Sequence, residues 1–448
     1  MLTPDAAREK VAQLVDRARR AGADAADAIY IGSSSQDVSV RMGALEDVGR
    51  SEGEEIGLRL FRGRRSASIA SSDLADATLA TMVERALAMA GEAPEDPYAG
   101  LAPDELLLRG TPHDLDLDDQ CEPDPAALKA RALAAEGAAL GIAGVRNSGG
   151  ASASASTSVS ALATSTGFCA ATHASGHGHS VTVIAGEGAT MQRDYAWHSA
   201  RHLSDLEDEE AIGRRAGERA VARLGPVKFI PGVMPVLFDP RVATTLVGHF
   251  VAAISGAAIA RPASFLLGQL GQQIFAAGVT LIDDPLRQRG LRSRSFDSEG
   301  LPVAKRALVD DGVLTTWLAD SASARQLGIA PTGHAVRGTS GAPGAGPSNL
   351  TLQPGSRSRE AMIAGIDRGI LLTELIGQGV NGVTGDYSRG AAGFLIERGT
   401  IVGPVAEITV ASNLKDMFAT LEPADDLQLR RGIDSPTLLV PQMTVGSA

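Results

Sequence analysis

The segment ASASASTSV, residues 151–159, alternates small apolar side chains with hydroxyl-bearing ones. Successive side chains of an extended strand point to opposite faces, so this alternation predicts one face of small apolar residues and one face of hydroxyls. Small side chains suit a sheet that packs closely against its neighbours. We therefore interpret the segment as a strand of a closely packed sheet, although its composition resembles a low-complexity tract.

Strand-like segments flank this stretch on both sides. Residues 168–172, 180–184 and 191–197 continue the pattern toward the C-terminus, and together with 151–159 they predict a four-stranded meander. Short alternating segments also precede it, and glycines punctuate them: 27–31, 37–41, 55–61 and 65–70. This earlier group predicts an antiparallel sheet built of hairpins.

Helical periodicity separates the strand groups. Apolar residues recur at helical spacing in residues 3–20, with Thr3 as a candidate N-cap and Pro4 as the first helical residue. Further helices are expected over 74–90, 125–140 and 206–224. Residues 91–125 contain six prolines and the acidic run DLDLDD at 114–119, which predicts an irregular surface connection.

The stretch from Gly225-Pro226 to Pro231-Gly232 predicts a domain boundary, because the pattern of strand and helix signals changes after it. The expected domains are an N-terminal one over 1–225 and a C-terminal one over 226–448. Beyond the boundary, Pro240 begins a long apolar helix that we expect to reach about Ala260. Residues 333–348 are rich in Gly, Pro and Ser and predict a mobile loop. Strands occur in groups rather than in strict βαβ alternation, so the expected class is α+β: an antiparallel sheet with helices, then a mostly-β domain with a buried helix.

Composition limits the classes of function. The chain has 448 residues and a formal net charge of −12, which argues against direct nucleic-acid binding. Its two cysteines cannot build a disulfide framework or a four-cysteine zinc site. No basic segment followed by an apolar run opens the sequence, and its longest uncharged stretch, 242–260, is too polar for a confident membrane span. We therefore expect a cytoplasmic protein with free thiols and no membrane contact.

Three patterns are candidates for chemistry. The first is the cluster His173, His177 and His179, because two imidazoles on one strand face can hold zinc when further ligands converge. The second is the glycine pattern GQGVNG, residues 377–382, which matches G-x-G-x-x-G but lacks the helix start that a dinucleotide site needs. The third is Ser388, which lies near Asp386 and Arg389 but has no histidine after it in the chain.

Several longer segments resemble a known family. TELIGQGVN at 373–381 and VTGDYSRGAAGF at 383–394 resemble the signature of the PmbA/TldE branch of the TldD/PmbA family. Shorter segments share this likeness: MQRDY at 191–195, GLRSR at 290–294, PSNL at 347–350, EITV at 407–410 and NLKD at 413–416. The resemblance extends over nearly the whole chain and is most specific between about Val233 and Val440.

The resemblance implies a bacterial or archaeal protein of a family once called modulators of DNA gyrase. In that family the TldD subunit carries zinc through an H-E-x-x-x-H helix and a late cysteine. The TldD–TldE heterodimer acts as a metalloprotease on a microcin precursor and on unfolded peptides, whereas the TldE partner lacks the zinc ligands.

The present sequence falls on the zinc-free side of that division. The matching helix contains His249, but Phe250 follows it and Ile254 stands five residues later. Residues 427–444 contain no cysteine. Phe and Ile offer no lone pair to a metal ion. We therefore expect no metal and no catalytic residue in this chain, and zinc in a TldD-like partner subunit.

The expected function is that of a non-zinc subunit, which forms a heterodimer with a TldD-like paralogue, or a homodimer, and helps to hold an unfolded peptide. The segment 377–393 is expected nearest to the shared cavity, and an ion pair between Asp386 and Arg389 is expected to shape it unless one of them binds a peptide terminus. The candidate cavity or interface residues are Glu374, Gln378, Asn381, Asp386, Tyr387, Ser388 and Arg389.

Two alternatives stay open. One is an independent enzyme, with zinc at the histidine cluster or a hydrolytic Ser388. The other is a non-enzymatic, homodimeric interaction protein.

Overall fold

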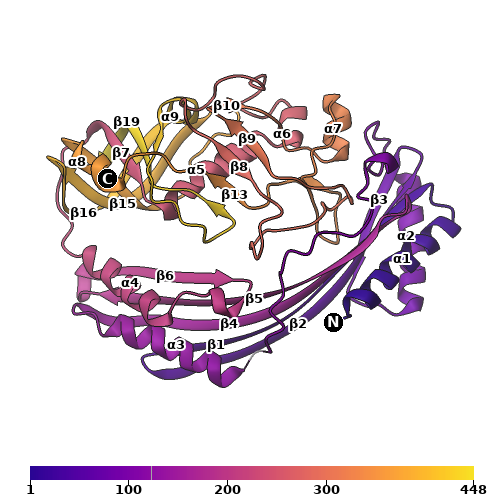
Figure 1. Cartoon of the computed structure of the whole chain (residues 1–448), viewed down its shortest axis with the longest axis horizontal. Coiled ribbons are helices and arrows are strands. Elements are labelled where there is room, and N and C mark those ends of the chain that lie inside the picture. Colours follow the sequence, from indigo (N-terminus) through magenta and orange to yellow (C-terminus); the bar gives the residue numbers. More distant parts are fainter. Residues whose placement is uncertain (123, 448) are drawn as a thin grey trace.

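The computed structural model describes residues 1–122 and 124–447; Pro123, which falls in the predicted connection, lies outside the described residues. A long, curved antiparallel sheet forms one side of the molecule, and the C-terminal part lies over the concave side of this sheet (Figure 1). Helices cover the opposite side. The predicted α+β class, with a β-rich C-terminal part and a buried helix, is confirmed.

The curved sheet has six strands in the order β3-β2-β1-β4-β5-β6. Their bounds are β1 Ala25–Arg41, β2 Ala44–Arg62, β3 Arg65–Ser71, β4 Val145–Thr164, β5 Cys169–Ala185 and β6 Gln192–Ala200. The predicted hairpins exist, but the strands are longer than expected and run through several of the glycines. The predicted four-stranded meander is wrong, because the segments predicted at 168–172 and 180–184 form one strand, β5, which begins at Cys169.

Residues 151–159 form the middle of β4, as predicted. Ala151, Ala153 and Ala155 are buried on the face that packs against helices. The hydroxyls lie on the other face, where Ser152 and Ser180 of β5 are hydrogen-bonded at 3.0 Å. Gly176 and Gly178 pair with Ser156 and Ser154 in continuous register, so they extend β5 instead of turning it.

Four helices cover the convex side of the curved sheet: α1 Pro4–Arg20, α2 Asp76–Glu92, α3 Pro125–Leu140 and α4 Glu209–Ala222. All four predicted helices are confirmed within a few residues. The Thr3 hydroxyl accepts a hydrogen bond from the Ala6 amide at 3.3 Å, so Thr3 is the N-cap of α1 as expected. Short 3₁₀ turns complete this half: η1 Asp104–Leu106, η2 Gly188–Thr190 and η3 Leu203–Asp205.

A second sheet closes on itself in the C-terminal part, because β16 pairs with both β15 and β19. Its strands are β7 Gly232–Phe238, β14 Arg368–Ile376, β15 Asp386–Glu397, β16 Thr400–Asn413, β17 Glu422–Pro423 and β19 Leu438–Ser447. A smaller sheet joins β8 Leu281–Asp283, β9 Arg306–Asp310, β10 Val313–Leu314, β13 Leu350–Leu352 and β18 Ile433–Asp434.

The apolar helix after Pro240 is two helices, not one. Helix α5 Pro240–Ala253 ends before Ile254, and α6 Gly256–Ala260 follows at once. The break has a structural cause: Ser255 forms a parallel bridge with Leu318, so its backbone leaves the helical path. The remaining helices are α7 Ser321–Leu327, α8 Arg359–Ala364 and α9 Leu414–Thr420.

The predicted mobile loop at 333–348 instead forms a small hairpin of β11 Ala335–Val336 and β12 Gly344–Ala345. Its tip contacts the curved sheet. The carbonyl oxygen of Thr339 lies so close to Gly57 in β2 that a Cβ atom at that position would be 1.9 Å from it. The hairpin therefore connects the two halves of the molecule.

A buried ion cluster fixes the same contact. Asp27 of β1 accepts a hydrogen bond from Arg59 Nε at 3.0 Å, and Arg337 of the hairpin donates to its other carboxylate oxygen. Burial alone would raise the pKa of Asp27, but the two guanidinium groups outweigh it and hold that pKa below its ordinary value.

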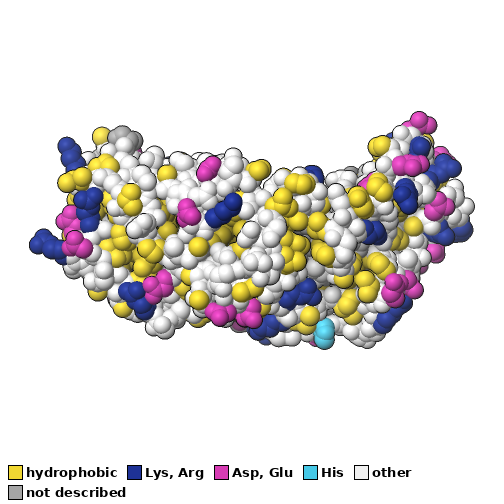
Figure 2. All heavy atoms as spheres, turned by 90° about the horizontal axis from the view of Figure 1, so that it is seen from above, with side chains coloured by type: hydrophobic (Ala, Val, Ile, Leu, Met, Phe, Trp, Pro, Cys, Tyr) yellow, Lys and Arg dark blue, Asp and Glu magenta, His cyan; other side chains and the backbone are white. Residues whose placement is uncertain are grey.

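The face seen from above in relation to Figure 1 carries apolar patches across its middle, and its charged side chains gather at the two ends and along one long margin (Figure 2). None of the helices in residues 1–122 and 124–447 is long and apolar enough to cross a membrane.

The close approach at Gly57 gives a first prediction. In Gly57→Ala the new methyl group meets the Thr339 carbonyl, so we expect a loss of about 1–3 kcal/mol in the free energy of unfolding. Gly53→Ala, in the same strand with open space around it, is the matched control and should change the free energy little. Denaturant titration of both variants measures the difference; equal stabilities would contradict the docking of the hairpin.

A second prediction concerns Asp27. Because its pKa is lowered in the folded protein, its contribution to stability is present above about pH 4 and is lost as the pH falls through the folded pKa. Asp27→Asn should cost about 3–5 kcal/mol at pH 7, since it leaves two buried arginines without their counter-ion. The difference between variant and parent, measured by urea unfolding, should shrink below pH 4. A constant difference across this range would refute the assignment.

Candidate functional site

Helix α5 is the place where the resemblance locates the zinc ligands of TldD. His249 lies on this helix, and its ring is 6.1 Å from the ring of Tyr387 in an edge-to-face arrangement. Phe250 and Ile254 are fully buried in the hydrophobic core of the C-terminal part. Burial lowers the pKa of His249, and the positive charge of Arg389 lowers it further, so the imidazole is neutral at pH 7.

These residues do not fit a zinc ion. One imidazole is available, whereas a structural or catalytic zinc site needs three or four converging ligands. In the part of the chain that the structure describes, no group of three or more His, Cys, Asp or Glu side chains is arranged to hold a metal ion.

The glycine-rich segment after β14 folds back along β15. The Asn381 amide donates to the Asp386 carbonyl at 2.9 Å, and Val380 and Tyr387 form an antiparallel bridge. Gly379 is required here, because a Cβ atom would lie 1.9 Å from the Ser388 carbonyl oxygen. No helix follows the glycines, so the segment is a close-packed turn and not a dinucleotide-binding loop.

Candidate residues of β15 divide between its two faces. Tyr387 and Arg389 are buried on the inner face beside His249, and burial raises the pKa of Tyr387 to about 12. Asp386 and Ser388 are exposed on the other face. Asp386 accepts hydrogen bonds from Thr384 and Asn413, which lower its pKa.

The predicted ion pair between Asp386 and Arg389 is therefore wrong. The two residues are three positions apart in a strand, so their side chains leave opposite faces. Within the described residues, Ser388 has no hydrogen bond to a histidine, so a Ser–His pair of a hydrolase is not formed.

Gln378 and Glu374 lie in different settings. Gln378 lines a cavity of about 280 Å³ together with His249, Phe265 and Leu414. Glu374 binds Arg223, the residue that directly follows α4, and Arg223 also lies 3.5 Å from Asp194 of β6. Asp194 in turn receives two hydrogen bonds from Arg241 of α5, at 2.7 and 3.1 Å. Glu374 thus belongs to an ion-pair network that joins the two halves.

The histidine cluster has carboxylate partners that lie far away in the sequence. The acidic run 114–119 passes along the edge of β5, where the Ser175 amide donates to the Leu117 carbonyl at 2.9 Å. His173 Nδ1 lies 2.8 Å from Asp118, and His177 Nε2 lies 2.8 Å from Asp119. His173 and His177 therefore each face a different carboxylate, and the described histidines do not converge on one metal position.

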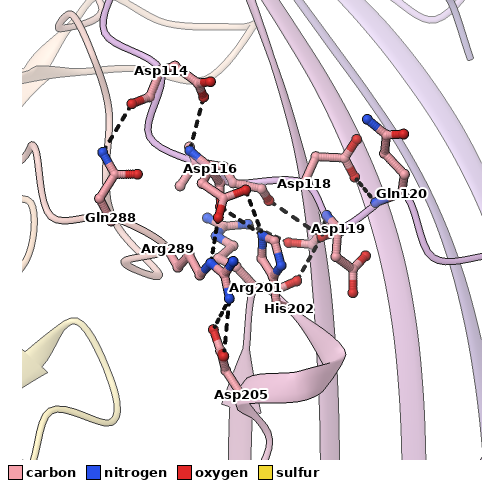
Figure 3. A network of polar contacts seen from close by, with 12 residues as sticks. Asp114, Asp116, Asp118, Asp119, Gln120, Arg201, His202, Asp205, Gln288 and Arg289 are labelled. Carbon is pink, nitrogen blue, oxygen red and sulfur yellow. Dashed lines mark hydrogen bonds and ion pairs between the residues drawn. The ribbon is translucent and has the colours of Figure 1, made fainter.

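The same acidic run reaches the C-terminal part. Asp116 binds both His202 and Arg289, and Arg289 also contacts Asp205 (Figure 3). Gln288 donates to the Asp114 carbonyl at 3.1 Å. Residues 114–119 of the predicted surface connection thus form a strap that holds the curved sheet and the C-terminal part together. Sequence reasoning missed it because its partners are more than fifty residues away in the chain.

Sequence reasoning also missed a cavity of about 240 Å³ between β6 and the C-terminal part. It is lined by aromatic Tyr195 and Trp197, by polar and small residues, and by six arginines against three aspartates. The arginines are Arg215, Arg219, Arg241, Arg359, Arg430 and Arg431. They come from four separate stretches of the chain, so neither spacing nor composition reveals that they converge.

Three family models match successive parts of the chain: PmbA/TldA metallopeptidase domain 1 at residues 26–90, the central domain at 118–224 and the C-terminal domain at 231–447. The chain is 37% identical to a protein of Escherichia coli O157:H7 named Metalloprotease PmbA, over 94% of this chain and 92% of that protein.

Two solved structures are similar over nearly the full length. A candidate modulator of DNA gyrase from Bacteroides thetaiotaomicron superimposes with a TM-score of 0.91, at 27% identity and with both chains fully covered. TldE from Thermococcus kodakarensis has a TM-score of 0.86 at 19% identity, covering 98% of this chain and 100% of that one, and so shares the fold. By its matches to all three family models and to a full-length relative, the chain belongs to the PmbA/TldD family.

Proposed function

We propose that the chain is the zinc-free, PmbA/TldE-type subunit of a cytoplasmic TldD–TldE metalloprotease. A TldD-like paralogue carries the zinc and the catalytic base, and the present chain dimerises with it and helps to hold an unfolded peptide. The expected reaction of the complex is hydrolysis of peptide bonds in the partner's active site.

One observation carries this proposal. The resemblance locates the zinc ligands of TldD on helix α5, but here Phe250 of that helix and Ile254 directly after it belong to the hydrophobic core. The imidazole of His249 packs against Tyr387 and has no second ligand beside it in the described chain. A subunit that has kept the fold while its α5 helix contributes to packing is suited to shape a chamber, not to cleave a bond.

The fold that the chain shares with TldE of Thermococcus kodakarensis is consistent with the subunit role. The name of the Escherichia coli relative, Metalloprotease PmbA, supports the assignment to proteolysis. Large apolar side chains that are more than a third exposed include Leu267, Leu270, Ile376 and Val383, and they suit contact with a partner subunit.

The proposal predicts how activity and zinc divide between the subunits. The purified chain should contain far less than one zinc per molecule and should not cleave an unfolded peptide, because it lacks the ligands. Co-expression with a paralogue that bears H-E-x-x-x-H should give an active complex with one zinc per heterodimer. Peptide cleavage and metal content of each subunit and of the complex are the measurements.

His249→Ala serves as the internal control of that experiment. Because His249 is not a ligand in this proposal, the zinc content of the complex should not change. Stoichiometric zinc in the isolated chain that is lost in His249→Ala, or full activity of the paralogue alone, would overturn the proposal.

We also propose that the segment 377–393 borders the peptide-holding chamber. Gln378→Ala removes a polar group from the wall of the His249 cavity and should raise KM for an unfolded peptide roughly two- to tenfold, the value of one neutral hydrogen bond. Gln442→Ala alters an exposed glutamine of β19 that lies outside both that wall and the segment 377–393, and it is the matched control. Kinetics of the assembled complex test this; an unchanged KM in Gln378→Ala would remove Gln378 from the site.

A further inference from the structure

Six arginines line the cavity beside β6, and four of them already have a carboxylate partner. Arg241 is bound by Asp194, and Arg359 lies 3.1 Å from Asp239. Arg215 and Arg430 share Glu207, at 2.9 and 2.5 Å. Each of these four guanidinium groups therefore has a carboxylate beside it within the protein, although the four share three carboxylates.

Arg219 and Arg431 differ, since neither has a carboxylate oxygen within 4 Å of its guanidinium in the described chain. Arg219 donates only to the Tyr195 carbonyl, at 3.3 Å. Arg431 donates to the Arg241 carbonyl at 3.2 Å and lies over the ring of Trp197, 5.1 Å from its centre. Burying part of a guanidinium without a counter-ion costs free energy, so Arg219 and Arg431 together favour an anionic ligand.

The three aspartates that line the cavity are not counter-ions of Arg219 or Arg431. Asp239 pairs with Arg359. Asp434 accepts the backbone amides of Arg430 and Arg431, and Asp426 accepts both the amide and the hydroxyl of Thr437. Burial lowers the pKa of both Arg219 and Arg431; for Arg219 the next largest cause is the positive charge of Arg241, which lowers it further, while Asp239 and Asp194 act in the opposite direction. Six guanidinium groups line the cavity against three carboxylates, so its lining carries a surplus of positive charge although the chain as a whole is acidic.

The cavity lies beside β6, the last strand of the curved sheet. The Tyr195 and Trp197 carbonyls of β6 already accept hydrogen bonds from Arg219 and Arg430, so a ligand in the cavity meets guanidinium groups rather than open backbone groups. A neighbouring cavity of about 230 Å³ continues along Ser199 and shares Arg430 and Arg431. A peptide whose last residues lie in that neighbouring cavity would thus bring its end to the unpaired arginines.

On this basis, and resting on the proposed role in holding unfolded peptides, we propose that Arg219 and Arg431 bind the C-terminal carboxylate of the peptide. A guanidinium presents two parallel N–H groups that match a carboxylate, and the contact with Trp197 fixes the plane of Arg431. The site would select peptides with a free C-terminus and position them along β6.

The test compares peptides that differ in where they carry a carboxylate. A fluorescent, unstructured peptide with a free carboxylate, its C-terminal amide, and the amide with one internal glutamate are titrated against the full chain. The free acid should bind roughly 10- to 100-fold more tightly than the amide, as expected for hydrogen bonds to a charged group. Arg219→Gln and Arg431→Gln should each reduce this preference, and the double variant should abolish it.

Arg214→Gln is the matched control, because Arg214 lies on the same helix, pairs with Asp208 and Glu210 in solvent and does not line the cavity. It should leave the preference unchanged. Arg219→Lys keeps the positive charge but loses the two parallel N–H groups, so it should keep more of the preference than Arg219→Gln does and less than the parent chain. Thermal midpoints confirm that each variant is folded.

Several outcomes would overturn the inference: no binding of any peptide, equal affinity for acid and amide, a preference that survives in the double variant, or binding of the glutamate amide as tightly as the acid. Inorganic phosphate that displaces the acid at lower concentration than acetate does would identify a phosphate site instead. The same peptides are then given to the complex with the zinc-bearing paralogue. Cleavage without a preference for the acid would refute this site alone, whereas binding preference without cleavage would refute the subunit role alone.

Discussion

Strand β4 carries two different surfaces, because its side chains alternate between alanine and hydroxyl-bearing residues. The alanine face lets α1 and α3 pack directly on the sheet. The serine face has no bulky side chain along 152–158 and leaves the concave side open, where the C-terminal part lies. The C-terminal part contacts the curved sheet through the strap, the 333–348 hairpin and the buried Asp27 cluster. Larger side chains on the serine face would push the sheet and the C-terminal part apart.

Charged groups at the junction of the two halves have a second role. Asp194 and Glu374 bind Arg223 and Arg241, so they hold α4 and β6 against α5 and β14. The same junction assembles more arginine than acid, and this surplus gives an acidic protein a basic cavity. Docking of the two halves and the capacity to attract an anion therefore come from one set of side chains.

Local patterns were sufficient for much of the fold. The alternation of 151–159, the helical periods and the Thr3 cap each follow from near neighbours, and all were correctly predicted. The missed features depend on distant pairs: the continuity of β5 is set by its register with β4, and the end of α5 by the Ser255–Leu318 bridge. For the site, the lack of zinc ligands on α5 was readable from His249, Phe250 and Ile254. The opposite faces of Asp386 and Arg389 were readable from strand geometry but were overlooked, and the arginine cavity required the tertiary structure.

The closed C-terminal sheet has a consequence for synthesis of the chain. β19 pairs with both β7 and β16, and the ribosome makes it after the other four strands of the ring. Until residues 438–447 emerge, β7 and β16 are the two unpaired edges of an open sheet, and such edges readily accept strands from other molecules. A nascent-chain chaperone or a partner subunit that adds a strand has this interval in which to act, because the completed ring of five strands has no free edge.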